Sequence, residues 1–344
     1  MVTDRYGKAP MSKKVGTDPL ALPHSGVTSL RALDPIPSSV VVLGGMGFIG
    51  SAVARVLINE GHKVSVVARS EPKRLPAWLS NATLIRLEAS DAPTYNAVLE
   101  GASQVVYSLA GLLPQESNLS PLRDVTETLR PLIGLLEALR SRPETSMVFL
   151  SSGGTIYGNP RVLPVSEDHP TNPITSYGIL KLTAEKYIGM YRDIYGVKAR
   201  ILRIANAYGP LQPVGRAQGV VGEFMSSVLN GSPIRIFGTG RSVRDYIHVD
   251  DVALAVAAAL KSDGPLILNV GTGVGTSLLQ IHQVLQEIVG RRIEVDFFES
   301  RGFDVESIVL DAAAFQALTG LTPIELRIGL HQTWRDVASH DVLG

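Results

Sequence analysis

The feature that most constrains the fold is an apolar strand that runs directly into a glycine-rich turn, VVVLGGMGFIG, at residues 40–50. After it, SAVARVLINEGH has the apolar spacing of a helix that ends at Gly61, and KVSVVARS at residues 63–70 is a second short apolar strand. A strand, a glycine turn, a helix and a second strand make one βαβ unit. This segment therefore predicts a parallel sheet that is covered by helices.

The same alternation continues along the chain. Further strands are predicted within residues 83–91, 104–111, 147–152 and 199–210, and a long helix that contains Pro131 is predicted at 122–140. Strands that alternate with helices predict an α/β fold with a doubly wound parallel Rossmann sheet. From Gly209 onward, loops rich in Pro and Gly and shorter helices predict a smaller mixed α/β lobe for the substrate.

We expect residues 38–205 and 236–272 to form the Rossmann domain, and residues 206–235 and 273–344 to form the lobe that binds the substrate. Residues 1–37 mix charged residues with Pro and Gly and have no apolar signal segment, so a disordered tail is expected there.

Composition excludes several classes of function. The 344 residues are 45% apolar, which suffices for a large core, and 32 basic residues balance 32 acidic ones. A balanced surface has no global field to attract nucleic acid or an acidic membrane, and no apolar run is long enough to span a bilayer. The chain has no cysteine, and its histidines, His248 and His282 among them, lack ligand spacing. We therefore expect a cytoplasmic protein without a metal site, a membrane partner or a nucleic-acid partner.

The glycine turn has the spacing of a phosphate-binding loop. Gly44, Gly47 and Gly50 follow a GxxGxxG pattern, which allows a tight turn, close approach of the backbone to a phosphate, and close packing of the helix on the strand. The first turn of the helix, at Phe48 and Ile49, would donate N–H groups to a dinucleotide pyrophosphate. The alternative is an ordinary connection between a strand and a helix.

Other strand ends supply further candidates for contacts with a dinucleotide. Asp91 would accept a hydrogen bond from the adenine amino group, cap the helix that begins before Pro93, or do both. The residues that end the fourth predicted strand would pass under the ribose, and these are Leu109, Ala110 and Gly111.

The end of the second strand bears on the choice between NAD and NADP. A carboxylate at this position favours NAD, but this chain has Ala68 there, followed by Arg69. A cation favours a 2′-phosphate, so NADP is slightly preferred and NAD is the close alternative. Arg69 would otherwise stack on adenine or face water.

The sequence SYGILK places Tyr177 and Lys181 four residues apart, on one face of a predicted helix. A nearby ammonium group and a positive nicotinamide ring would favour the phenolate form of the tyrosine. The phenolate would then remove a hydroxyl proton while a hydride leaves the same carbon. The alternative is a pair on the protein surface that arose by chance.

Together these motifs resemble an extended short-chain dehydrogenase/reductase of the nucleotide-sugar epimerase/dehydratase group, from about residue 40 to near the C-terminus. The motifs that carry the resemblance are GGMGFIG, SSGGTIYG, SYGILK, LRIANAYGP, IRIFGTGRSVRDYIHVDDVA and NVGTGVGTS. The resemblance implies a Rossmann fold, bound NAD(P) and a nucleoside-diphosphate sugar as substrate. It also implies a homodimer joined by a four-helix bundle, here through the helices that contain residues 132–139 and 177–191.

The segment SSGGTIYG departs from the family pattern. Similar proteins carry a catalytic Ser or Thr four residues before the tyrosine of this segment, and here that position is Gly153. We expect Thr155, or else Ser152, to hold the C4 oxygen of the sugar instead. The alternative for Ser151 and Ser152 is that their hydroxyls only satisfy backbone groups at the strand end.

The same segment bears on the type of reaction. Dehydratases and decarboxylases of the family carry acidic residues just after the Ser/Thr position, whereas this chain has Gly154 and Thr155. The resemblance therefore implies a 4-epimerase, acting on a UDP-sugar through a transient 4-keto intermediate. We also expect the two glycines, Gly153 and Gly154, to leave room for that intermediate to rotate.

The resemblance and the residue chemistry suggest four contacts with the substrate. Asn206 would donate to a phosphate, or else stabilise a turn, and Arg244 would bind the diphosphate, or else pair with Asp245. Arg301 resembles a second arginine that binds the diphosphate in the family. Phe237 would line the pocket of the nucleotide base, or else belong to the core.

Two other functions fit the same motifs. One is an NAD(P)-dependent reductase or dehydrogenase that releases reduced cofactor, acting on a sugar or another hydroxyl substrate. The other is a catalytically silent sensor that binds a dinucleotide, which the glycine at position 153 favours and the intact pair of Tyr177 and Lys181 disfavours.

Overall fold

The computed structural model describes residues 40–69, 76–87, 91–210, 212, 219–262, 264–302 and 305–341. The tail predicted at residues 1–37 lies outside the described residues, and so do Lys73 and Arg74, two further basic residues after Arg69 that would favour NADP. The described residues all belong to one compact unit.

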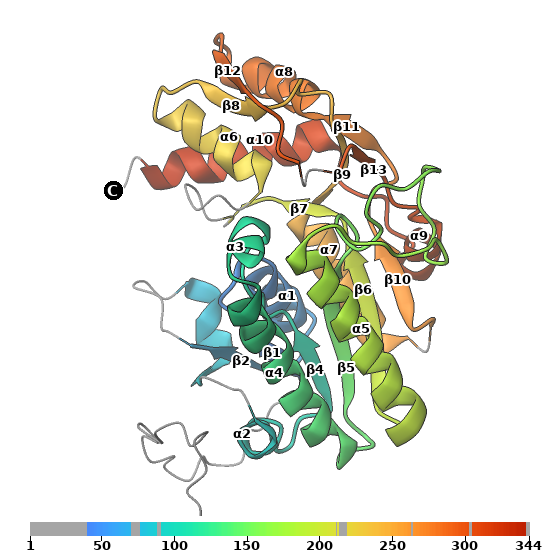
Figure 1. The fold of residues 1–344 in the computed structure, drawn as a ribbon. Helices are drawn as coiled ribbons and strands as arrows, with labels where there is room; N and C mark the ends of the chain where they lie inside the picture. The colour runs from blue at the N-terminus through green and yellow to red at the C-terminus, as the bar shows by residue number, and fades with distance from the viewer. Residues whose placement is uncertain are drawn as a thin grey trace, which may run out of the picture. The chain divides into compact units, whose positions relative to one another are not determined.

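A parallel sheet of seven strands, counted over the described residues, forms the centre of this unit (Figure 1). The strand order is β10-β6-β5-β4-β1-β2-β3, so the direction of winding reverses between β1 and β4. In sheets of this kind ligands bind outside the carboxyl ends of the strands at this reversal. The strands are β1 (Val40–Leu43), β2 (Val64–Ala68), β3 (Thr83–Arg86), β4 (Gln104–Tyr107), β5 (Ser146–Ser152), β6 (Lys198–Ile204) and β10 (Ile267–Val270).

Strand β1, at the centre of the sheet, is apolar throughout because helices cover both faces of the sheet. Val40 and Val42 pack in one core cluster with residues of α1 (Phe48–Asn59) and α7 (Val249–Lys261). Val41 and Leu43 point to the other face, and pack in a second cluster. The helices of that second cluster are α2 (Ala92–Val98), α4 (Pro121–Arg140) and α5 (Ser176–Tyr195).

Two smaller sheets and a third core cluster make up the rest of the unit. In one sheet β7 (Asn206–Tyr208), β11 (Gly275–Ser277) and β13 (Ser307–Ile308) pair with β9 (Val243–His248), and the pairings are both parallel and antiparallel. The other sheet joins β8 (Ile234–Phe237) and β12 (Val295–Phe298). The third cluster lies among α6 (Val220–Leu229), α8 (Leu278–Val289) and α10 (Leu326–Asp341).

The prediction of a Rossmann sheet with a smaller mixed α/β portion is confirmed. The predicted Rossmann domain included residues 243–248, whereas this strand, β9, pairs within the smaller sheet. The division into two lobes stays a proposal. The remaining helices are the 3-10 helix η1 (Ala77–Asn81), α3 (Pro114–Leu119) and α9 (Ala313–Thr319).

The two helices that were predicted to join a homodimer, α4 and α5, lie side by side (Figure 1). Helix α5 begins after Thr175, whose hydroxyl accepts a hydrogen bond from the N–H of Gly178 at 3.1 Å, and ends at the left-handed Gly196. This cap places Tyr177 in the first turn of the helix, at the edge of the sheet where ligands bind. Among the described helices, none combines the length and the apolar character that a bilayer crossing requires.

Candidate active site

The glycine turn between β1 and α1 forms a cradle that side chains would block. Gly44 has a φ of +76°, and a Cβ atom there would lie 2.7 Å from the carbonyl oxygen of Ser108. A Cβ atom at Gly50 would overlap the carbonyl oxygen of Gly44. Gly47 is the N-cap of α1 and has no side chain that could cap the helix. Because Gly44, Gly47 and Gly50 carry no side chains and the turn ends at a helix N-terminus, the cradle fits a dinucleotide pyrophosphate.

The end of β4 meets this cradle. A Cβ atom at Gly44 would lie 3.2 Å from the Leu109 side chain, so the two strand ends are in contact at the reversal of the winding. Gly111 packs directly against Thr128 of α4. Ala110, which lies between Leu109 and Gly111 in the chain, is exposed. These contacts bring the predicted residues Leu109, Ala110 and Gly111 to the same edge of the sheet as the glycine turn.

The adenosine end of the predicted site has no carboxylate at the end of β2. The N–H of Gly44 donates to the carbonyl of Val67 at 2.9 Å, which places Ala68 and the exposed Arg69 beside the glycine turn. Asp91 is the N-cap of α2, and its carboxylate accepts a hydrogen bond from the N–H of Thr94 at 3.0 Å. Hydrogen bonds from Thr94 lower the pKa of Asp91, so of the two roles predicted for Asp91 the structure contains the helix cap.

Strand β5 ends next to the predicted catalytic tyrosine. The Ser152 side chain hydrogen-bonds the phenol of Tyr177. Burial raises the pKa of Tyr177 to about 12, and the hydrogen bond from Ser152 opposes that shift. Tyr177 is therefore a neutral phenol at neutral pH unless further positive charge comes close to it.

Lys181 lies one turn further along α5 and is 5% exposed. Its Nζ donates to the carbonyl of Leu150 at 3.0 Å and lies 5.8 Å from the centroid of the Tyr177 ring. Burial lowers the pKa of Lys181 to about 8, and the carboxylates of Glu185 and Asp124 oppose that shift. The alternative of an exposed surface pair is therefore wrong, because the ammonium group is held inside the protein beside the tyrosine.

The Thr155 hydroxyl was expected ahead of that of Ser152 as the group beside Tyr177, and the geometry favours Ser152 instead. It is Ser152 that contacts Tyr177, whereas the Thr155 hydroxyl is buried and has no hydrogen-bond partner among the described residues. The backbone of Thr155 instead approaches α5, where a Cβ atom at Gly178 would lie 3.1 Å from the Thr155 carbonyl oxygen. Position 178, directly after Tyr177, is therefore a glycine, because the loop after β5 passes close to α5 there.

The space expected beside Gly153 is filled. A Cβ atom at Gly153 would lie 2.5 Å from Cδ1 of the buried Leu310 and 3.0 Å from the carbonyl oxygen of Arg203. A Cβ atom at Gly154 would lie 2.7 Å from Oδ1 of Asn206. The expectation that Gly153 leaves room for a rotating sugar is therefore wrong, since the missing side chain points into the core.

The residues predicted for the diphosphate lie at three places. Asn206 starts β7 and, through its contact with Gly154, belongs to the edge where β5 ends. Arg244 donates to the carbonyls of Val243 at 2.9 Å and Glu306 at 3.2 Å, and also to that of Val305. Arg244 thus holds the segment that follows Arg301.

Asp245, the alternative partner predicted for Arg244, serves a different purpose. Its buried carboxylate accepts hydrogen bonds from the N–H and hydroxyl of Thr272, at 2.9 and 2.6 Å, and from the N–H of Gly273 at 3.1 Å. It therefore stabilises the turn after β10.

Arg301 and Phe237 are in contact although they lie 64 residues apart in the sequence. The guanidinium carbon of Arg301 lies 3.6 Å from the centroid of the Phe237 ring. Phe237 lies at the end of β8, half-buried, and its ring centroid is 5.5 Å from that of Phe298. The structure thus joins the two residues that were predicted for the base and the diphosphate.

Both histidines considered in the sequence have structural contacts. Buried His248 caps α7 and accepts a hydrogen bond from the N–H of Asp250 at 3.3 Å, while Nε2 of His282 lies 2.9 Å from the carbonyl oxygen of Ile293. Across the described ranges, no group of three or more His, Asp and Glu side chains has an arrangement that could hold a metal ion.

Three buried charged residues near the site were not predicted from the sequence, and these are Asp124, Glu185 and Arg203. Asp124 accepts hydrogen bonds from Thr128 at 2.8 Å and from Ser117, and its charge raises the pKa of Tyr177. A signal was present for Glu185, which follows Lys181 by four residues and so lies on the same helix face.

Comparison with known proteins decides the family. The model of the NAD dependent epimerase/dehydratase family matches residues 40–271. The chain belongs to this family. The predicted resemblance to extended short-chain dehydrogenases/reductases of the epimerase type, and with it the predicted enzyme class, is confirmed.

Relatives of this family member cover most of its length. A UDP-glucose 4-epimerase of Mycolicibacterium smegmatis is 33% identical over 301 residues, 85% of this chain and 96% of that protein. The UDP-glucose 4-epimerase of Thermotoga maritima, solved with UDP-glucose, is 33% identical with a TM-score of 0.82, over 88% of this chain and 99% of that one. The Thermus thermophilus UDP-glucose 4-epimerase, solved with NAD, is 31% identical with a TM-score of 0.80, over 87% and 98%.

Proposed function

We propose that this family member interconverts the two C4 epimers of a UDP-sugar through a transient 4-keto sugar, with NAD(P) as cofactor. One observation carries the proposal, the hydrogen bond between Ser152 and Tyr177 beside the buried ammonium of Lys181. The named activities of the Mycolicibacterium and Thermotoga relatives support the substrate class.

The reacting groups are Tyr177, Ser152 and Lys181. Tyr177 accepts the proton of the C4 hydroxyl, and Ser152 hydrogen-bonds the same oxygen and aligns it with the phenol. A bound oxidised dinucleotide supplies a hydride acceptor and a positive ring near the phenol. Because burial raises the pKa of Tyr177 to about 12, this positive ring and the ammonium of Lys181 are both needed to favour the phenolate.

The loop after β5 supports epimerisation over dehydration. Elimination of water needs an acid and a base at neighbouring carbons, and positions 154 and 155 offer a glycine and a threonine. The side chain next to Gly154 is the amide of Asn206. With no carboxylate at this place, return of the hydride to the other face of the keto sugar is the reaction that the residues favour.

The nucleotide part of the substrate occupies the smaller portion of the fold in this proposal. Asn206 donates to a phosphate, Arg301 pairs with the diphosphate, and Phe237 packs on the base. Arg244 fixes the backbone of residues 305 and 306, behind Arg301. The stacking of Arg301 on Phe237 supports a site in which both residues contact one nucleotide.

We further propose that the adenosine site accepts a 2′-phosphate, so that NADP is slightly preferred over NAD. The support is the end of β2, where Ala68 stands in place of a carboxylate and the exposed Arg69 lies beside the glycine turn. A carboxylate would repel the 2′-phosphate, whereas a guanidinium group binds it.

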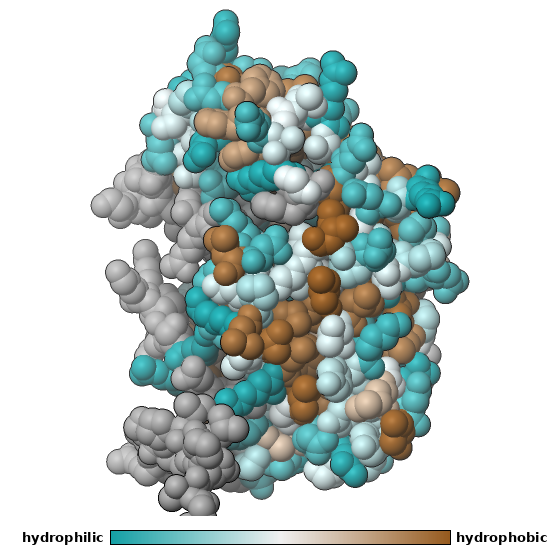
Figure 2. Space-filling model, in the orientation of Figure 1, coloured by the Kyte–Doolittle hydropathy of each residue, from teal (hydrophilic) through white to brown (hydrophobic). Residues whose placement is uncertain are grey.

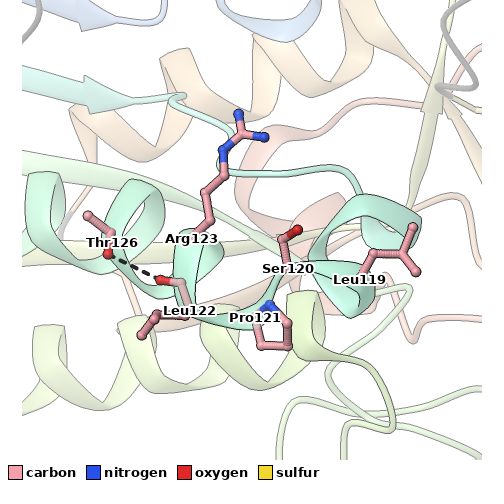
Figure 3. Close-up of a pocket in the computed structure, with 6 residues that line it drawn as sticks. All are labelled: Leu119, Ser120, Pro121, Leu122, Arg123 and Thr126. Carbon is pink, nitrogen blue, oxygen red and sulfur yellow. Dashed lines mark hydrogen bonds between the residues drawn. The ribbon is translucent and has the colours of Figure 1, made fainter.

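We also propose a homodimer through α4 and α5. Exposed apolar side chains cover this pair of helices, and Figure 2 shows a band of them across the middle of the molecule. They include Leu122, Val125, Ile179, Met190 and Ile194. A shallow pocket between α3 and α4 continues the band, lined by Leu119 to Arg123 and by Thr126 (Figure 3). A second copy of the same helix pair would complete a four-helix bundle and remove this surface from water.

The function is tested by incubating purified protein with UDP-, GDP- and dTDP-sugars without added cofactor and following the products by NMR. We expect a UDP-sugar to give its C4 epimer without net formation of reduced cofactor. The matched control is Tyr177→Phe, which removes the proton acceptor and should lower turnover by roughly 10² or more while KM stays within a few-fold.

Two other results would replace the proposal. Stoichiometric formation of reduced cofactor would indicate a dehydrogenase. Dinucleotide binding without turnover of any sugar nucleotide would indicate a sensor.

A further inference from the structure

A row of polar side chains continues from the active site along one face of α5. Tyr177, Lys181 and Glu185 follow one another at intervals of four residues, so each lies one turn below the previous one. Lys181 is 5% exposed and Glu185 is 4% exposed. The row therefore leads from the phenol into the interior of the protein.

Glu185 has partners on both neighbouring strands. Its carboxylate accepts a hydrogen bond from the Ser151 hydroxyl at 2.5 Å, and from Nη2 and Nε of Arg203 at 2.7 and 3.2 Å. Arg203, on β6, is as buried as Glu185. A buried charge without partners is costly, and here the guanidinium group and the hydroxyl supply partners to the buried carboxylate.

The other side of Arg203 fixes the loop after β5. Its Nη1 donates to the Tyr157 hydroxyl at 2.9 Å and to the carbonyl of Glu167 at 3.0 Å. The Tyr157 hydroxyl in turn donates to Oδ1 of Asn269 on β10 at 2.7 Å. Glu185 is thus held in place by contacts that reach three strands of the large sheet.

We propose that Glu185 is a positioning residue, whose carboxylate keeps the buried ammonium of Lys181 charged beside Tyr177. Resting on the proposed function, this inference adds a residue that touches neither the sugar nor the dinucleotide. The phenol, the ammonium, the carboxylate and the guanidinium group then follow one another, and the charges alternate in sign from Lys181 to Glu185 to Arg203.

The groups around Lys181 give the expected direction. Burial lowers the pKa of Lys181 to about 8, and Glu185 on α5 and Asp124 on α4 both oppose that shift. The other titratable groups near it among the described residues are Tyr177 on the same helix and Arg203 behind Glu185. Loss of the Glu185 charge therefore lowers the pKa of Lys181 further, and the ammonium is neutralised closer to neutral pH.

The test is Glu185→Gln, which keeps the shape of the side chain and removes its charge. Carbon-13 labelling of the nine lysines allows an NMR titration, with Lys181→Arg to assign the signal of Lys181. We expect the pKa of Lys181 to fall by roughly one unit or more, the scale expected for loss of a nearby opposite charge. The matched control is Asp193→Asn at the exposed end of α5, which should leave this pKa unchanged.

Turnover gives a second measurement. The alkaline limb of the kcat profile should move to lower pH by the same shift as the NMR value, with KM within a few-fold. If Glu185 only stabilised the fold, Glu185→Gln would lower the melting temperature and leave the pH profile of kcat unchanged. Glu185→Gln leaves the charge of Arg203 buried without its partner, so this variant can fail to fold. In that case the double variant Glu185→Gln/Arg203→Gln replaces it. The pKa of Lys181 in the double variant should also fall.

An unchanged pKa of Lys181 in either folded variant would overturn the inference. The NMR titration needs no substrate, so it gives the same answer if the wild-type protein turns over no sugar nucleotide. Failure of the proposed function and failure of this inference are thereby distinguished.

Discussion

At the scale of single residues, the contact between Ser152 and Tyr177 favours Ser152 over Thr155 as the hydroxyl that serves the proposed reaction. Ser152→Ala removes the partner of the phenol, so kcat should fall roughly 10- to 100-fold. Thr155→Val replaces a buried hydroxyl that has no hydrogen-bond partner among the described residues. Its effect on kcat should stay within a few-fold, and stability should hold or rise, because an unpaired buried hydroxyl is unfavourable.

Steady-state kinetics and thermal unfolding of the two variants make this comparison. A larger loss of kcat for Thr155→Val would contradict the assignment and move the role to Thr155.

Gly153 gives a second prediction at this scale. Gly153→Ser forces the new side chain against Leu310 and the carbonyl of Arg203, and overpacking of this kind costs about 1–3 kcal/mol of unfolding free energy. Urea unfolding measures the loss. The control is the same substitution in a Leu310→Ala background, where the serine should cost less because the obstructing side chain is gone. An equal cost in both backgrounds would rule out the contact with Leu310 as the cause.

At the scale of elements, the exposed face of α4 and α5 predicts the oligomeric state. Ile194→Glu puts a charge on an apolar side chain that is 63% exposed, and in the proposed dimer this charge would be buried. We expect the wild-type protein to sediment as a dimer and the variant to dissociate into monomers. Val274→Glu is the matched control, since Val274 is also 63% exposed but lies outside the two helices. A monomeric wild-type protein, or a variant that stays dimeric, would refute the proposed bundle.

At the scale of the whole molecule, the strand order places the end of β2 next to the glycine turn, so in the proposed site Ala68 and Arg69 would face the adenosine ribose. Mass spectrometry of the dinucleotide released from denatured protein should find NADP. Arg69→Ala should weaken NADP binding about 10-fold or more, the scale of a lost charge-assisted hydrogen bond, and leave NAD binding almost unchanged. Release of NAD alone, together with equal affinity for the two dinucleotides, would contradict the role of Ala68 and Arg69.

Much of this molecule was predictable from the sequence because its signals are local. Val40 to Leu43, the glycines that follow and the helix after them are consecutive in the chain, and their spacing alone predicts the βαβ unit and its cradle. The pairing of Tyr177 with Lys181 was predictable for the same reason, since both lie on one helix. Strand and helix alternation then determined the Rossmann sheet, because parallel strands need helical connections.

Only the tertiary structure decided the contacts between distant segments. The direction of a side chain in the loop after β5 changes with each residue, so spacing could not show that Ser152 faces Tyr177 while position 153 faces Leu310. Arg203 reaches Glu185, and Arg244 reaches the carbonyl of Glu306, across strands and loops that no local pattern connects. Such pairings depend on how the sheets stack and where each loop crosses, and these are properties of the packed chain rather than of any one segment.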